Sequence, residues 1–239
     1  MTSAPPPADN PSSARRRPVE GGYARGEETR ARIVAAALKV FGEEGFEQAS
    51  TRRIAAEAGV TPPALQYHFD SKEGLHLACG QLLADRILAR LEAPLAGAAR
   101  ALEARDPAGA AEALYRLMEC LVEHSAASDK ASGWGRFLAR ADVEGAGPAL
   151  PLVRKLVFGP LVRTCIALTA AATGARVDDE HTRLKALMLM GQLSAFGAGR
   201  ANTLAAMGWT DLGGPRQAKV KRVLRQAVFA VLGVEAPQN

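Results

Sequence analysis

Residues 50–72 read STRRIAAEAGVTPPALQYHFDSK, and they predict two short helices that meet at a tight turn. Ser50 is a candidate N-cap for the first helix, which Gly59 closes. Thr61 is a candidate N-cap for the second helix, whose early prolines stand where a missing N–H costs little. Small Ala55 lets the two helices approach closely, and Gly59 can adopt the positive φ of the turn. This pattern is typical of a helix-turn-helix.

The outer surface of the second helix is the candidate DNA-binding surface, because Leu65 and Phe69 give the inward face. Hydroxyl, guanidinium and ammonium groups suit phosphate oxygens. Short polar and apolar groups at the start of the helix suit base edges in a major groove. The candidate DNA-binding residues are Thr51, Arg52, Thr61, Pro62, Pro63, Ala64, Gln66, Tyr67, His68 and Lys72. By itself the turn is also compatible with an ordinary solvated helical hairpin.

The residues before this stretch predict one helix and an arm. From Glu27 to the stop at Gly45, apolar residues recur at intervals of three and four, as in an amphipathic helix. Residues 1–26 are rich in Pro, Ala, Ser and Gly and predict a disordered arm. Its Arg15–Arg17 triplet is either a solvated tail or a contact to DNA phosphates.

The rest of the chain predicts helices only, so the fold class is all-α. The expected helices span 72–93, 108–126, 130–142, 149–174, 178–207 and 215–232, separated by Gly, Pro, Asp and Ser signals. The expected domains are the disordered arm 1–26, a helix-turn-helix DNA-binding domain 27–75, and a larger helical domain 76–239.

Composition describes a soluble globular chain: 239 residues, of which 48% are hydrophobic and 23% charged. The net charge of +5 permits an anionic partner. The charges of residues 1–75 cancel, so this excess lies in residues 76–239. No signal-peptide core and no uncharged apolar stretch of membrane-spanning length is present, which predicts a cytoplasmic protein without a membrane segment.

Metal and catalytic motifs are not apparent. The three cysteines Cys79, Cys120 and Cys165 lack the close pairing of a zinc site and predict reduced thiols. The four histidines have no Ser or Cys partner at a recognisable spacing, and no phosphate-binding glycine motif occurs. We therefore expect no metal, no cofactor and no enzyme, with an all-α small-molecule enzyme as the weaker alternative.

The N-terminal residues resemble the DNA-binding domain of the tetracycline-repressor (TetR) family. The likeness lies in TRARIVAAALKVF at 29–41, Gly45-Phe46, Ser50-Thr51-Arg52, Ile54-Ala55, Ala58-Gly59-Val60, Tyr67-His68-Phe69 and Lys72-Glu73-Gly74-Leu75. It implies a homodimeric bacterial transcriptional regulator, usually a repressor, that binds a palindromic operator. The resemblance implies phosphate contacts by Thr51, Tyr67, His68 and Lys72, and base contacts by Arg52 and residues 62–64.

The C-terminal half resembles the CecR-like branch of this family, through residues 137–140, Gly174, residues 187–193, Phe196 and Arg200. That branch commonly has an acid directly after the Arg, whereas this chain has Ala141 and then Asp142. The resemblance implies that the domain dimerises and binds a small-molecule effector. An architectural DNA-binding protein without a ligand is the alternative.

Two sets of residues in this half are candidates for these roles. For a pocket between helices they are Met118, His124, Trp134, Phe137, Arg140, Phe158, Arg163, Met188 and Gln192. For a dimer interface they are Gly191, Ser194, Ala195, Ala198, Val220, Val223, Leu224, Ala227, Val228 and Val231. Such an apolar stripe fits a core or an interface, and the family resemblance favours the interface.

Overall fold

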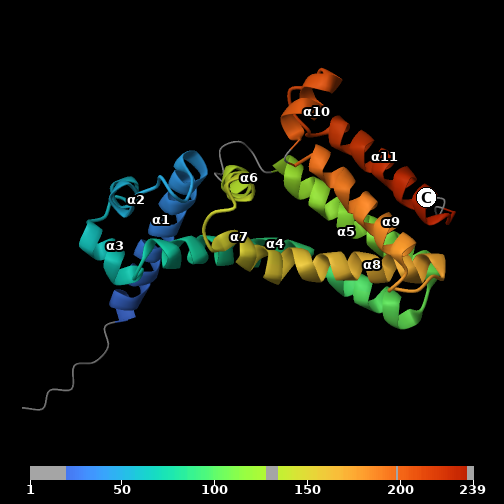
Figure 1. Ribbon diagram of the computed structural model, residues 1–239, viewed down its shortest axis with the longest axis horizontal. Helices are drawn as coiled ribbons and strands as arrows, with labels where there is room; N and C mark the ends of the chain where they lie inside the picture. Colours follow the sequence, from blue (N-terminus) through green and yellow to red (C-terminus); the bar gives the residue numbers. More distant parts are fainter. Residues whose placement is uncertain (1–19, 128–133, 198, 236–239) are drawn as a thin grey trace, which may run out of the picture.

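The computed structural model describes residues 20–127, 134–197 and 199–235, and this part of the chain contains helices and no strand. The predicted all-α class is confirmed. Figure 1 shows a small head of α1, α2 and α3 at one end and a larger helical body at the other. Arg15–Arg17 lie outside the described residues.

The head consists of α1 (Glu20–Glu44), α2 (Thr51–Ala58) and α3 (Pro62–His68), packed on the start of α4 (Lys72–Ala104). α1 begins seven residues before the expected Glu27. Its buried face includes Ile33, Ala37, Val40 and Phe41, the residues whose spacing predicted the helix. α2, the start of α4 and α6 (Trp134–Glu144) pack on α1, and the buried residues of the head continue into one apolar core with those of the body.

α4 joins the head to the body as a single helix of 33 residues. The sequence predicted its end at residue 93, directly before Pro94. Pro94 lies inside the helix instead, because α4 packs along α5 (Pro107–Ala127) and this burial offsets the lost backbone hydrogen bond. The division expected between residues 75 and 76 therefore falls within a continuous helix.

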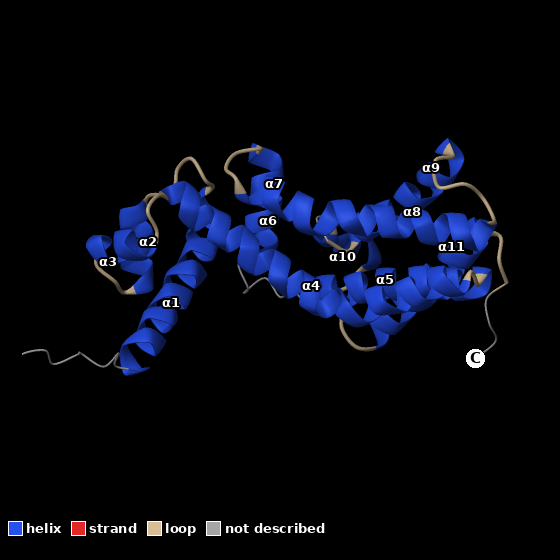
Figure 2. Cartoon of the chain, turned by 90° about the horizontal axis from the view of Figure 1, so that it is seen from below, coloured by secondary structure: helices blue, strands red, loops and turns tan. Residues whose placement is uncertain are grey.

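The body is a bundle in which α5 packs against α4, α8 (Gly159–Thr173) and α11 (Pro215–Leu232), and α9 (Glu180–Gly191) packs on α8. Figure 2 shows the same bundle from below, with α8 and α11 running above α5. α11 has the bounds that the sequence predicted. Two smaller helices, α6 (Trp134–Glu144) and α7 (Ala149–Val153), lie between the bundle and the head.

Two expected helices are interrupted. The predicted helix 149–174 is α7 and α8 joined by a π-helical turn, η1 (Arg154–Phe158). Pro160 lies two residues after this turn, and it has no N–H for the regular hydrogen-bond ladder. The predicted helix 178–207 is α9, a 3-10 turn η2 (Gln192–Ala195) and α10 (Arg200–Met207), because its glycines break the run.

The stretch Ala149–Thr173 is long and apolar enough to cross a membrane by length and composition. It packs against α4, α5 and α9, as the core helix of a helical bundle does. Cys79 and Cys165 are buried, Cys120 is half-buried, and all three are free thiols. Burial raises the pKa of Cys165 to about 12, so this thiol stays protonated and unreactive.

Candidate nucleic-acid interface

Side-chain caps define the two helices of the turn. Ser50 Oγ accepts a hydrogen bond from the Arg53 N–H at 3.2 Å and starts α2. Gly59 ends α2 in the left-handed conformation, with φ of 65°. Thr61 Oγ accepts from the Ala64 N–H at 3.4 Å and starts α3. The predicted helix-turn-helix is therefore present, with the caps that the sequence indicated.

The inner face of the turn is fixed by burial. Ile54, Ala55, Leu65 and Phe69 are all less than a tenth exposed. Arg30 of α1 stacks its guanidinium over the Phe69 ring, 5.0 Å from the centroid. Because α3 is held from behind in this way, its outer residues have a defined direction.

The predicted DNA-binding residues lie on the other side of this core. Tyr67 is 86% exposed, so its ring and its hydroxyl group are both accessible to a binding partner. The described part of the chain gives Arg52 no ion-pair partner, so its guanidinium is open to an anion. The other exposed candidates are Thr61, Pro62, Pro63 and Gln66. The half-buried candidates are Thr51, Ala64 and His68.

Lys72 differs from the other candidates, because the protein already uses its ammonium group. Its Nζ donates to the carbonyl oxygens of Glu47 at 3.2 Å and Ala49 at 3.4 Å. The same atom lies 4.6 Å from the centroid of the Phe46 ring. Lys72 thus secures the loop between α1 and α2, and one of its three N–H donors remains for a phosphate.

A charged cluster that the sequence did not predict joins α2 to α1. Lys39 of α1 pairs with Glu57 at 2.5 Å, and Arg53 pairs with Glu57 at 2.9 Å and with Glu44 at 3.5 Å. The hydrogen bonds from Lys39 and Arg53 lower the pKa of Glu57. Only the Arg53–Glu57 pair has a local spacing, i and i+4 on one helix, whereas Lys39 and Glu57 are 18 residues apart and their contact has no signal in the sequence.

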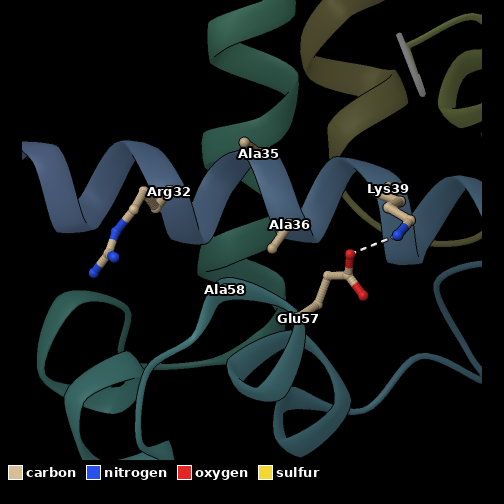
Figure 3. Close-up of a pocket in the computed structure, with 6 residues that line it drawn as sticks. All are labelled: Arg32, Ala35, Ala36, Lys39, Glu57 and Ala58. Atoms are coloured by element: carbon tan, nitrogen blue, oxygen red, sulfur yellow. Dashed lines mark hydrogen bonds and ion pairs between the residues drawn. The ribbon is translucent and has the colours of Figure 1, made fainter. Parts of the chain in front are cut away.

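Figure 3 shows the open hollow beside this cluster, between α1 and α2. Ala35, Ala36 and Ala58 line its middle, Lys39 and Glu57 lie at one end, and Arg32 extends at the other. Small side chains at this contact allow α2 to lie close to α1. The charged cluster and the alanine contact therefore hold α2, the first helix of the turn, against α1.

The structure does not bring the candidate pocket residues together. Met118 and Phe137 are buried in the core, whereas Phe158, Arg163, Met188 and Gln192 lie on the surface. Arg140 pairs with Glu144 and points at the end of α1. The side chains of His124 and Trp134 lie outside the described residues. The described side chains of this set therefore do not line a shared pocket.

The predicted interface stripe of α11 is mostly internal. Val220, Leu224 and Val228 are each less than a tenth exposed, because this face of α11 packs on α5 and α9 within the protomer. Val223 is 63% exposed, and Ala227 and Val231 are half-buried. Gly191, Ser194 and Ala195 are exposed, and Ala198 lies outside the described residues.

Exposed apolar side chains that the sequence did not assign to the dimer interface lie on α9. Leu184, Leu187 and Met188 are 49%, 48% and 71% exposed. With Gly191 they follow the spacing of one helical face. Because α9 and α11 are neighbours in the bundle, this face and Val223 belong to adjacent helices.

Two family profiles match the chain. Residues 33–79 match "Bacterial regulatory proteins, tetR family", and residues 110–234 match the C-terminal domain of the HTH-type transcriptional dual regulator CecR. The CecR of Shigella flexneri is 35% identical over 189 residues, which are 78% of this chain and 83% of that protein. Both predicted resemblances are confirmed, despite the departure at Ala141.

Solved structures have the same fold. A transcriptional regulator from Rhodococcus sp. Rha1 is 25% identical, with a TM-score of 0.56 over 85% of this chain and 96% of that one. AibR, solved in complex with isovaleryl coenzyme A and operator DNA, is 15% identical with a TM-score of 0.59. That likeness covers 87% of this chain and all of AibR, and it concerns the fold alone.

Proposed function

The chain belongs to the TetR family of bacterial regulatory proteins and is a transcriptional regulator, and from this membership we propose a homodimeric repressor that a small-molecule effector releases from its operator. The observation that carries the proposal is the outer face of α3. It presents Tyr67, Gln66 and two prolines to solvent beside an uncommitted Arg52, on a turn that is capped and packed from behind.

The residue roles follow the chemistry of that face. Arg52 and the α3 residues Pro62, Pro63, Ala64 and Gln66 read base edges, and Thr51, Tyr67, His68 and the remaining donor of Lys72 contact phosphates. Thr61 caps α3 and stands at the same surface. These contacts place α3 in a major groove, as in other helix-turn-helix proteins.

The dimer forms through α9 and α11. The exposed residues Leu184, Leu187 and Met188, with Val223 on the neighbouring helix, supply the apolar contact. A two-fold axis through this face pairs two helices from each protomer in a four-helix bundle. The two recognition helices then fit successive major grooves about 34–36 Å apart.

The body, residues 76–239, binds the effector, and residues 27–75 bind DNA. Effector binding favours a dimer with another spacing of its heads, which lowers operator affinity by a shift in populations. The match of residues 110–234 to a regulator's C-terminal domain supports this role. The protein acts in the cytoplasm by binding DNA and has no catalytic role.

The test is selection of bound fragments from a random DNA pool with the full-length protein at two salt concentrations. An enriched palindrome supports the proposal, and its genomic neighbours nominate effectors. Binding that is sensitive to salt but enriches no sequence would instead indicate an architectural DNA-binding protein. The repressor role predicts that deletion of the gene raises transcription from the promoter beside the selected site.

A further inference from the structure

The last turn of α6 reaches from the body to the loop that precedes α2. Glu144 Oε2 accepts a hydrogen bond from the Phe46 N–H at 3.2 Å. Gly45, beside it, has φ of 84°, and a side chain there would collide with the Glu144 carboxylate. The loop therefore has room for the Glu144 carboxylate only because residue 45 has no side chain.

Arg140 completes the contact from one turn earlier on α6. Its Nε pairs with Glu144 Oε1 at 2.5 Å, and its Nη2 donates to the Glu44 carbonyl oxygen at 3.4 Å. Glu44 is the last residue of α1, so this carbonyl lacks a partner within the helix. Two side chains of α6 thus satisfy backbone groups at the end of α1 and in the loop.

A second contact anchors the segment that follows α6. His76 of α4 is buried among the rings of Phe41, Phe46 and Phe137, and its Nδ1 accepts from the Ala149 N–H at 3.2 Å. A Cβ at Gly147 would collide with His76 and Phe46. Residues 140–149 of the body are therefore fitted to α1, the loop and α4 together.

The loop that α6 grips leads directly into the DNA-binding turn. It ends at Ser50, the cap of α2, and Lys72 binds its carbonyl groups at Glu47 and Ala49. A displacement of α6 would pull on the Phe46 N–H and the Glu44 carbonyl first. The displacement would then pass to α2 through residues 47–50, which connect Phe46 to that helix.

We propose that Arg140 and Glu144 are positioning residues, which fix the orientation of the DNA-binding head on the body by holding residues 44–46. The inference rests on the proposed function, since orientation matters only where two heads must fit one operator. Arg140 and Glu144 side chains are 45% and 23% exposed. Ion pairs at such exposed positions contribute little to the free energy of unfolding. The positioning role is therefore distinct from a contribution to folding stability.

The test uses the full-length protein and the operator from the selection experiment. For Glu144→Ala, the Phe46 amide should exchange its hydrogen at least tenfold faster. Affinity for the palindromic operator should fall about tenfold, because two loosened heads must be ordered on binding. Affinity for a duplex with a single half-site should stay within twofold, because the turn itself is intact.

Three further variants sharpen the test. Glu144→Gln keeps an acceptor oxygen for the Phe46 N–H and should recover most of the operator affinity. Arg140→Ala should produce a smaller loss in the same direction. Asp142→Asn is the matched control, because Asp142 lies on α6 but pairs with Arg154 and not with the head. Its operator affinity should equal that of the wild type.

Two results would overturn the inference. One is an operator affinity of Glu144→Ala equal to that of Asp142→Asn. The other is an equal loss on the operator and on the half-site, which would mean that the substitution damages the head itself. A wild-type protein that selects no sequence would instead refute the proposed function, so the two failures are distinguishable.

Discussion

At the scale of single residues, two neighbouring arginines of α2 differ in whether they form ion pairs. Arg52 has no ion-pair partner among the described residues, whereas Arg53 pairs with Glu44 and Glu57. We expect Arg52→Ala to weaken operator binding tenfold or more, since a good base contact is worth about 1–3 kcal/mol. Arg53→Ala is the matched control and should change operator affinity less than Arg52→Ala. Titrations by fluorescence anisotropy check both, and equal losses would contradict the assignment.

His76 gives a pH dependence. Burial, and then the charge of Lys72, lower its pKa from 6.5 to about 4, against the opposing charges of Glu144 and Glu73. Between these values the unfolded chain binds a proton that the folded chain does not. The free energy of unfolding should therefore fall as pH drops from 6.5 toward 4, by at most about 1.4 kcal/mol per pH unit.

Chemical denaturation of the wild type and of His76→Gln across this range checks the effect. The glutamine side chain does not titrate, so the wild type should lose more stability than the variant on acidification. Parallel curves would show that His76 does not carry the dependence. The carboxylates titrate in both proteins and cancel in the comparison.

The sequence predicts which kinds of group a side chain can bind, and the structure shows which group it does bind. Exposed Tyr67 and Gln66 followed from the spacing of Leu65 and Phe69. Lys72 and Arg140 were assigned to a phosphate and a ligand pocket because their charges suit anions. In the structure Arg140 binds the Glu44 carbonyl oxygen at the end of α1, 96 residues away along the chain. Lys72 binds the Glu47 carbonyl oxygen in the loop after α1, 25 residues away, and keeps one donor for a phosphate. No local pattern signals such distant partners.

At the scale of elements, helix bounds were predictable where a strong local signal coincides with packing. α11 begins at Pro215 and ends before Gly233 as expected, because proline and glycine mark both ends. Pro94 misled the prediction for α4, since contact with α5 continues through it. The stripe of α11 was ambiguous because a core face and an interface face have the same spacing.

The inward face of α11 gives a prediction for stability. Leu224 is 4% exposed, so Leu224→Ala should lower the free energy of unfolding by about 2–5 kcal/mol. Leu77→Ala is the matched control, because Leu77 is 38% exposed, and it should cost less than half as much. Urea denaturation at one protomer concentration checks both. Equal costs would mean that Leu224 is not part of the protomer core.

At the scale of the whole molecule, the two-part plan and the family were predictable, and the surface between protomers stays a prediction. Met188 is 71% exposed on α9, where we place the dimer contact. Met188→Asp should weaken dimerisation about a hundredfold, because a carboxylate would enter an apolar interface. Met207→Asp is the control, since Met207 is 53% exposed on α10, outside that contact. Sedimentation velocity over a dilution series checks this, and a dimeric Met188→Asp protein would contradict the proposed face.

The proposed function requires that two copies of α3 read the DNA bases. The most direct measurement is to repeat the DNA selection with Gln66→Arg in the full-length protein and compare the enriched sequence with that of the wild type. We expect a palindrome altered at one symmetric pair of positions, because arginine and glutamine prefer different base edges. An unchanged palindrome, or a change in only one half-site, would contradict it.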